Sequence, residues 1–448
     1  MLPRKTALAI ATFVLIAVLA PNIPGKEHLP GISPRAVASA FTLRIPWPEA
    51  RSIPAPAAPT AVPVKAPGVT APAPSPDLTV PPGSLDRFFK ALRRAEARRP
   101  GAVVRVLHYG DSPTTADSIT ADVRKLLQRR FGDAGHGFLL IAKPWAWYGH
   151  NGIGLDAKGW EIAPASQARA ADGFHGLGGV SFRGESGAYS RVTLPDDRHT
   201  RATVYYLGQP GGGSFSVMNN WDRGGAVIAK IDTGADEKRP GFAEFALPDG
   251  TQTIELRVTT GRVRLFGYRF DKDQPGVQYS SLGVNGAQVQ MVVRYFEAGQ
   301  WTAALRHENP DLVVVNYGTN ESIFPEYIEK QYPDELRSVV ARIREALPDA
   351  SLLIMSPMDR GVPEGGDIVT PPALEKLIDV QKQIAAETGC AFFNTFEAMG
   401  GAGTMGRWYR EQPRLVSADF MHPLPPGAAK VGALFEKALV AAYESSPQ

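Results

Sequence analysis

The sequence predicts an α/β protein with a mostly parallel sheet, interrupted by an inserted module made only of strands. Residues 84–154 and 273–448 alternate short apolar runs with segments whose apolar residues recur every three or four positions, as strands and helices in turn do. Residues 155–272 instead contain short alternating segments broken by Gly, Pro, Asn and Asp, which is typical of a β-sandwich or jelly roll.

The elements of the two α/β parts follow from the spacing of apolar residues. One segment places an apolar residue at every fourth position from Ile119 to Phe131, and Gly132 is a typical helix end. Strands covered by helices on both faces are apolar throughout, as residues 312–315 are. The predicted strands are 102–109, 311–318, 351–357 and 391–396, and the predicted helices are 84–99, 117–132, 333–349, 373–389 and 427–443.

The N-terminal residues have the composition of an export signal followed by a spacer. Arg4 and Lys5 precede an apolar run, so we expect residues 1–22 to be a signal peptide or an uncleaved signal anchor. Residues 23–83 are rich in Pro and Ala, which predicts a disordered, extended tether. We therefore expect the protein in the periplasm or cell envelope, with membrane contact only through its N-terminus.

Composition excludes several classes of function. The formal net charge of +3 on 448 residues is too small to indicate a nucleic-acid partner. Cys390 is the only cysteine, so no intrachain disulfide can form and a cysteine-based zinc site is not expected. We predict no metal and no organic cofactor.

Three polar motifs fall where an open α/β sheet binds its ligands, beyond the carboxyl ends of the strands. They are "YGDS", ending at Ser112, "YGTN", ending at Asn320, and "DFMH", from Asp419 to His422. A serine hydrolase needs a nucleophile, a histidine base, a carboxylate that orients the base, and donors for the oxyanion. Each motif also has a simpler interpretation: a helix cap, a turn residue and a surface pair.

Taken in order, the motifs resemble the sequence blocks of the SGNH (GDSL-type) hydrolases over residues 102–440. The stretch "SSLGVNGA" resembles the remaining block, with Gly286 as its glycine and Gly283 as the alternative. The resemblance implies a three-layer α/β/α fold. It also implies that Ser112, Asp419 and His422 form a catalytic triad, and that Ser112, Gly286 and Asn320 form the oxyanion hole.

The strand-rich insert narrows the resemblance to the periplasmic peptidoglycan O-acetylesterases. This implies removal of acetyl from the 6-hydroxyl of N-acetylmuramic acid, with the insert similar to a carbohydrate-binding module. The expected partner is thus an O-acetylated glycan, with peptidoglycan as the first choice. One departure is Pro113, because the family usually has His after the serine. Proline suits a first helical turn, but a polar neighbour of the substrate is lost and the exact sugar stays open.

Four further residues are candidates for substrate binding. Trp145, Trp147 and Tyr148 lie in "KPWAWYGHNG" and could either stack on sugar rings or pack the junction with the insert. Arg360 follows the predicted strand 351–357 and could orient the substrate.

Two other functions remain open from the sequence. A glycan O-acetyltransferase would use the same site and the same acetyl-enzyme, and would differ in how water reaches it. A non-catalytic glycan-binding envelope protein would not need Ser112, Asn320 and His422 to come together.

Overall fold

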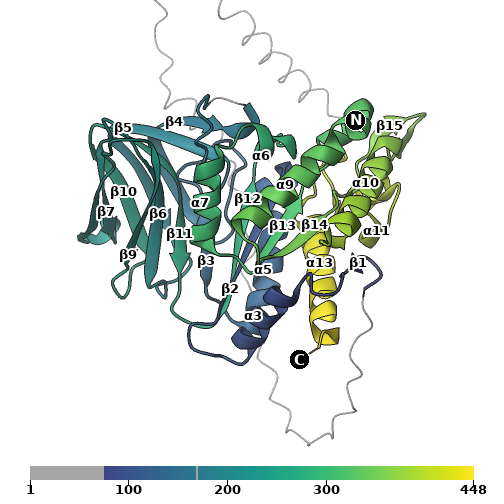
Figure 1. Cartoon of the computed structure of the whole chain (residues 1–448), viewed down its shortest axis with the longest axis horizontal. Helices are drawn as coiled ribbons and strands as arrows, with labels where there is room; N and C mark the ends of the chain where they lie inside the picture. Colours follow the sequence, from purple (N-terminus) through teal and green to yellow (C-terminus); the bar gives the residue numbers. More distant parts are fainter. Residues whose placement is uncertain (1–74, 168–169, 448) are drawn as a thin grey trace, which may run out of the picture. The chain divides into compact units, whose positions relative to one another are not determined.

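The computed structural model describes residues 75–167 and 170–447. The predicted export signal and most of the predicted tether therefore lie outside the described residues. Two large sheets organise the described part: a six-stranded sheet flanked by helices, and a nine-stranded sheet beside it, with α7 (Ala298–Glu308) between them (Figure 1). Among the described residues no helix is both long and apolar enough to cross a membrane.

The six-stranded sheet is parallel apart from one edge strand. Its order is β1-β17-β14-β13-β2-β12, and only β1 runs antiparallel to its neighbour, β17. The strands are β1 (Leu78–Thr79), β2 (Val103–Gly110), β12 (Gly276–Gly283), β13 (Leu312–Asn316), β14 (Ser351–Met355) and β17 (Ala391–Phe393).

Helices cover both faces of this sheet, which explains why its strands are apolar throughout. Val104 and Val106 of β2 join one core with α3, α5 and α13, whereas Leu107 and Tyr109 point to the other face and join the core of α7, α9 and α10. The predicted layers of helix, sheet and helix are therefore present. The helices are α3 (Asp86–Glu96), α4 (Ser112–Thr115), α5 (Ser118–Phe131), α6 (Gln290–Arg294), α7, α8 (Pro325–Lys330), α9 (Tyr332–Ala346), α10 (Pro372–Thr388), α11 (Thr395–Ala398), α12 (Thr404–Arg410) and α13 (Pro425–Ser445).

The strand-rich region forms one sheet that nearly closes on itself. Its path runs β8-β7-β10-β5-β11-β6-β9, with β4 paired to β5 and β3 paired to β11, and the two ends, β8 and β9, are neighbours. The coarse prediction of an all-β region is confirmed, whereas the jelly-roll topology stays a prediction. The strands are β3 (Gly135–Leu139), β4 (Gly154–Pro164), β5 (Val180–Thr193), β6 (Arg201–Gly208), β7 (Ser214–Asn219), β8 (Val227–Asp232), β9 (Arg239–Ala246), β10 (Thr253–Thr260) and β11 (Arg262–Asp271). A small hairpin, β15 (Val362–Glu364) and β16 (Asp367–Val369), stands apart.

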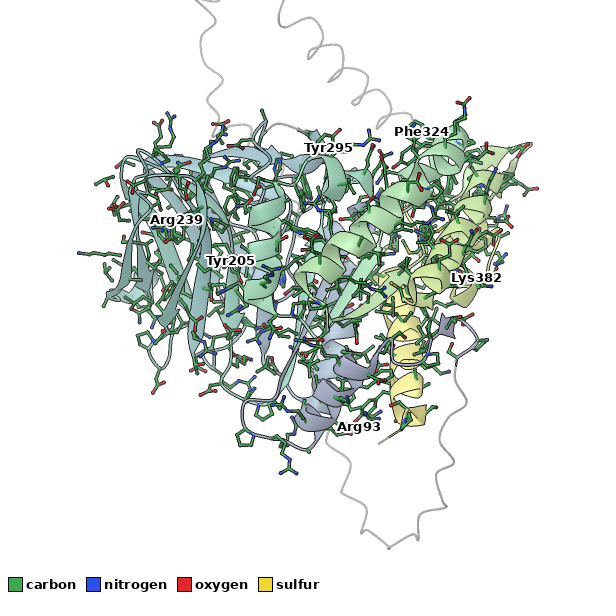
Figure 2. The ribbon with its side chains drawn as sticks, in the orientation of Figure 1. Arg93, Tyr205, Arg239, Tyr295, Phe324 and Lys382 are labelled. Carbon is green, nitrogen blue, oxygen red and sulfur yellow. The ribbon has the colours of Figure 1, made fainter. Side chains whose placement is uncertain are left out.

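The nine-stranded sheet is docked onto the α/β part through α7. Tyr205 of β6 donates its hydroxyl hydrogen bond to Glu308, and its ring meets His307 edge-on at 5.5 Å between centroids (Figure 2). The apolar core on this face of the six-stranded sheet continues into the strand-rich region without a break. The chain enters that region directly after α5 and returns through β12, which pairs with β2.

Candidate active site

The strand-to-helix bend after β2 holds Ser112 at the first position of α4. Gly110 is required here, because a Cβ on it would lie 2.2 Å from Thr114 Oγ1. Pro113 occupies the first turn of the short helix, where no backbone donor is needed. Only 9% of the surface of Ser112 is exposed, so this residue is largely enclosed by protein rather than surrounded by solvent.

A closed loop before α13 presents the Asp-x-x-His motif to this serine. The Ser417 N–H donates to the His422 carbonyl at 2.9 Å, and Val416 pairs with Pro423 as an isolated bridge. Phe420 takes a positive φ of 56° to close the loop. The loop therefore fixes the backbone on both sides of His422.

Ser112, His422 and Asp419 form a continuous chain of hydrogen bonds. His422 Nε2 lies 2.8 Å from Ser112 Oγ, and His422 Nδ1 lies 2.8 Å from Asp419 Oδ2. With Nδ1 protonated toward Asp419, Nε2 is free to accept the serine proton. The three side chains that the sequence placed in separate motifs are thus brought together in one geometry.

Asp419 is held as a carboxylate by its own loop. Partial burial opposes its ionisation. However, hydrogen bonds from the Ser417 hydroxyl, the His422 N–H and side chain, and the Met421 N–H outweigh burial and keep the pKa of Asp419 below its usual range. A permanent negative charge therefore faces His422 Nδ1.

The oxyanion candidates lie on the two loops next to the bend. Gly286 has φ +70° and open space around it, and within the described residues neither its N–H nor that of Ser112 donates to a backbone acceptor. Asn320 donates one amide hydrogen to the Ala287 carbonyl at 2.8 Å, which leaves the second for another acceptor. Gly283, by contrast, packs under the elbow, since a Cβ there would lie 2.4 Å from Thr115 N.

Two buried carboxyl groups hold these loops together, and sequence reasoning missed the role of Glu321. Asp111 accepts from the Thr319 N–H at 3.2 Å, and Glu321 accepts from the Val289 N–H at 2.6 Å. Burial raises the pKa of Asp111 to about 6 and that of Glu321 to about 8. Their position directly after Gly110 and Asn320 was the only available signal.

A cavity of about 400 Å³ opens in front of Ser112, and we call it the serine cavity. Trp147 lines it with 56% of its surface exposed. Asn285, which the sequence did not single out, lies on the wall directly before Gly286. The full lining is Ser112, Pro113, Ala116, Ser118, Trp147, Asn285, Asp419, His422 and Pro423.

The other three predicted substrate-binding residues do not line this cavity. Tyr148 is buried in the core, where its hydroxyl accepts from the Leu140 N–H at 2.9 Å. Trp145 is half-buried against the same core and meets Tyr148 edge-on. Arg360 is half-buried after β14, and among the described residues its guanidinium has no acidic partner.

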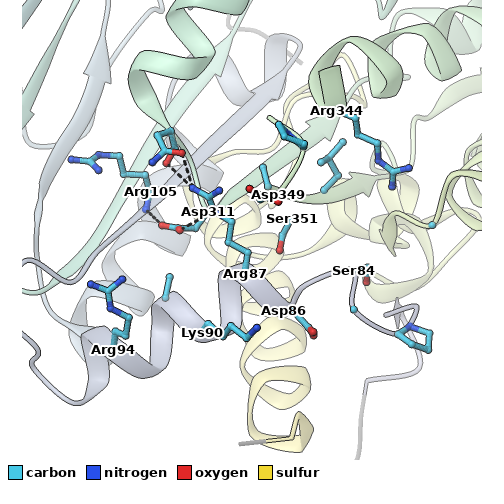
Figure 3. Close-up of a pocket in the computed structure, with 18 of the residues that line it drawn as sticks. Ser84, Asp86, Arg87, Lys90, Arg94, Arg105, Asp311, Arg344, Asp349 and Ser351 are labelled. Atoms are coloured by element: carbon cyan, nitrogen blue, oxygen red, sulfur yellow. Dashed lines mark hydrogen bonds and ion pairs between the residues drawn. The ribbon is translucent and has the colours of Figure 1, made fainter. Parts of the chain in front are cut away.

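A larger cavity, of about 970 Å³, lies at the opposite, amino-terminal edge of the sheet, between α3 and the starts of β2 and β14 (Figure 3). Its labelled side chains are mainly basic and acidic, and Arg87 is paired with Asp311 at 3.3 Å. No histidine lines it to activate Ser84 or Ser351. Within residues 75–167 and 170–447, no three His, Cys, Asp or Glu side chains form a group able to hold a metal ion.

Comparison with known proteins agrees with this geometry. Residues 250–430 match the GDSL-like Lipase/Acylhydrolase family. The chain contains a GDSL-like lipase/acylhydrolase domain. This family and the hydrogen-bonded Ser–His–Asp chain make the protein a carboxylic ester hydrolase. No curated protein matches the sequence.

Among solved structures, a peptidoglycan O-acetylesterase shares the fold over most of this chain. The TM-score is 0.70 at 22% identity, covering 82% of this chain and 99% of the other. An acetylxylan esterase from Geobacillus stearothermophilus, at 21% identity, covers 37% of this chain and 73% of its own, with a TM-score of 0.29. The second likeness is too partial to support an argument, whereas the first shows that both sheets belong to a known architecture.

Proposed function

We propose that this protein is a serine esterase that removes O-acetyl groups from a cell-envelope glycan, most simply peptidoglycan, through an acetyl-enzyme. The observation that carries the proposal is the chain from Ser112 Oγ through His422 to Asp419, with both links at 2.8 Å. The proposal is also supported by the serine cavity, which Ser112, His422 and Asp419 all line, because an ester in that cavity can reach the Ser112 hydroxyl.

The reaction follows from these positions. Ser112 Oγ attacks the acetyl carbonyl while His422 Nε2 takes its proton, and Asp419 stabilises the imidazolium that forms. The N–H groups of Ser112 and Gly286, with the free amide hydrogen of Asn320, stabilise the oxyanion. His422 returns the proton to the sugar oxygen as the C–O bond breaks. Water, deprotonated by His422, then releases acetate and restores Ser112.

The exposure of the base favours hydrolysis over transfer to a second sugar. The side chains of His422 and Asp419 are 41% and 50% exposed, so water reaches the face of the imidazole that must activate it. A transferase needs to keep water from the acetyl-enzyme, and an imidazole with this exposure does not. A non-catalytic glycan binder gains nothing from the Ser112–His422 contact.

An acetylated glycan as substrate is supported by the shared fold with a peptidoglycan O-acetylesterase and by Trp147. An exposed indole beside the serine cavity offers an apolar face for a sugar ring. From the shared fold with a peptidoglycan O-acetylesterase, and from the predicted export signal, we infer that the enzyme works outside the cytoplasm. We also propose that the nine-stranded region binds carbohydrate.

The test is acetate release by the purified protein from p-nitrophenyl acetate and from O-acetylated peptidoglycan. We expect activity on both, and a loss of several orders of magnitude in kcat for Ser112→Ala. Ser338→Ala on α9, a serine whose hydroxyl donates only to the Asp334 carbonyl of its own helix, is the control and should retain activity. Turnover of p-nitrophenyl acetate without release of acetate from peptidoglycan would reject peptidoglycan as the substrate. If the native protein and the Ser112→Ala variant are both inactive on both compounds, the proposal of an esterase is rejected.

A further inference from the structure

Three of the four large apolar side chains that are exposed in the described part of the chain lie on segments next to predicted site residues. Trp147, Ile323, Phe324 and Val227 are the four large hydrophobic residues exposed in the described part of the chain. Trp147 lines the serine cavity, and Ile323 and Phe324 follow Asn320 on the neighbouring loop. Clustered exposed apolar surface indicates binding, whereas a single exposed side chain such as Val227 needs no explanation.

A second pocket, of about 430 Å³, lies beside the oxyanion candidates, and we call it the glutamine pocket. It is built by the two segments that continue from Gly286 and Asn320. These segments are joined by the hydrogen bonds from Asn320 to the Ala287 carbonyl and from the Val289 N–H to Glu321. The pocket is lined by Gln288, Gln290, Phe324, Glu326, Tyr327, Lys330 and Gln331.

The pocket is close to the reacting atoms because the chain between them is short. Three residues separate Asn320 from Phe324, and they form a 3₁₀ turn over Glu321–Ile323 that advances only about 2 Å per residue. Phe324 lines the pocket and directly precedes α8. A group bound there is therefore within about 10 Å of the oxyanion candidates, within reach of a neighbouring unit of a polymeric substrate.

The lining fits a sugar better than an anion or an acyl chain. Three glutamine amides line it, and two of them bond each other, with Gln290 donating to Gln288. Gln331 accepts from Arg294. The remaining amide hydrogens and oxygen lone pairs suit hydroxyl groups, which both donate and accept. Phe324, 48% exposed, and Tyr327 supply apolar faces for ring C–H groups. The two charged residues of the lining, Lys330 and Glu326, form an exposed pair at 3.3 Å, so the lining has no net charge. A bound acyl chain would place apolar groups against these amides and leave them without hydrogen-bond partners.

We propose that the glutamine pocket binds a sugar unit of the same glycan chain whose acetyl ester lies at Ser112. This inference rests on the proposed function, and it makes the enzyme selective for acetyl groups within a chain rather than on a free monosaccharide. The glycan would extend from Trp147 across the elbow to Phe324.

Binding is the first test, because it does not depend on turnover. The full chain carrying Ser112→Ala is titrated with O-acetylated peptidoglycan fragments and with acetylated xylan. Adding Phe324→Ala or Gln288→Ala should weaken binding about tenfold, which is about 1.4 kcal/mol. Adding Lys437→Ala, an exposed residue of α13, should not change it.

Kinetics separate this inference from the proposed function. In the otherwise native enzyme, Phe324→Ala should lower the ratio of kcat/KM for glycan over p-nitrophenyl acetate about tenfold, through KM. Equal affinity with and without Phe324→Ala and Gln288→Ala, or no binding of either glycan by the Ser112→Ala protein, would overturn the inference. Loss of the proposed function alone would instead appear as ester turnover that does not depend on Ser112.

Discussion

At the scale of single residues, Asp419 determines what His422 can do. Its carboxylate accepts from His422 Nδ1 and also from three groups of its own loop, so its charge and its orientation are both fixed. The aspartate thereby selects the imidazole tautomer in which Nε2 faces Ser112 as an acceptor.

Asp419→Asn keeps the shape of this side chain and removes its charge. We expect kcat on p-nitrophenyl acetate to fall about 10³- to 10⁴-fold, because the amide stabilises the wrong tautomer and leaves the imidazolium without a counter-charge. Steady-state kinetics above pH 6 measure this. Asp349→Asn, an exposed aspartate at the opposite sheet edge, is the control. A decrease in kcat of less than tenfold would mean that Asp419 only shapes its loop.

The sequence pointed to Ser112, Asn320, Asp419 and His422 because reactive side chains follow strand ends, and strand ends are readable from apolar runs. It could not point to Glu321 as a buried support. Charged residues are rarely buried, so this glutamate looks like a surface residue until the loops around it are placed. Trp145 and Tyr148 show the converse problem, since three aromatics in one short stretch divide between core and cavity only in the folded chain.

At the scale of elements, the start of α5 is anchored by a buried ion pair. Asp117 precedes the helix with a positive φ of 53° and pairs with Arg124 at 2.7 Å, with both side chains at most 2% exposed. It also accepts from the Asn151 N–H, which ties α5 to the loop that carries Trp147. Since Ala116 and Ser118 line the serine cavity, this pair supports one wall of it.

Asp117→Asn should therefore destabilise the fold strongly. It leaves the Arg124 guanidinium buried without a counter-charge, which typically costs about 3–5 kcal/mol. Denaturant-induced unfolding measures the change. Asp122→Asn on the same helix breaks only the exposed pair with Lys125 and should cost less than about 1 kcal/mol. Similar losses for both variants would show that burial of the first pair contributes nothing.

Helices with an uninterrupted apolar stripe were predictable, and those stabilised by polar tertiary contacts were not. The segment predicted as a helix over 117–132 is α5, Ser118–Phe131. In α7 the buried stripe contains Gln300 and Glu308, whose partners are the Gly176 N–H and the Tyr205 hydroxyl. Tyr205 lies on β6 of the nine-stranded sheet and Gly176 in the loop before β5. The helical period of α7 can therefore be recognised only after this region has docked. The same sheet includes β3, which precedes the predicted start of the insert at residue 155.

At the scale of the folded part described here, the two edges of the six-stranded sheet have different surfaces. The carboxyl edge carries the Ser112–His422 pair, exposed apolar side chains and the glutamine pocket. The amino edge carries a cavity lined by charged groups. Ester chemistry requires a hydroxyl, a base and a partly apolar wall in one place, and only the first edge has all three.

Burial of Glu321 beneath the carboxyl edge makes the stability of the fold depend on pH. Burial raises the pKa of this carboxyl from its ordinary value of 4.5 to about 8. Between these values the folded chain keeps a proton that the unfolded chain releases, so the free energy of unfolding falls as pH rises from about 4.5 to about 8. Asp111 acts in the same direction at lower pH, since its pKa is raised to about 6.

Glu321→Gln removes this titration while its side-chain oxygen can still accept from the Val289 N–H. We expect the variant to be more stable than the native chain at pH 8, by about 1–3 kcal/mol, and no more stable at pH 4. Thermal unfolding midpoints of both proteins at the two pH values measure this difference. Glu326→Gln, an exposed glutamate five residues away, should leave both midpoints unchanged. A Glu321→Gln chain that unfolds more easily than the native one at pH 8 would mean that the oxyanion loops need the ionised carboxylate. In that case Glu321 would act on the site as a charge rather than as a neutral hydrogen-bonding support.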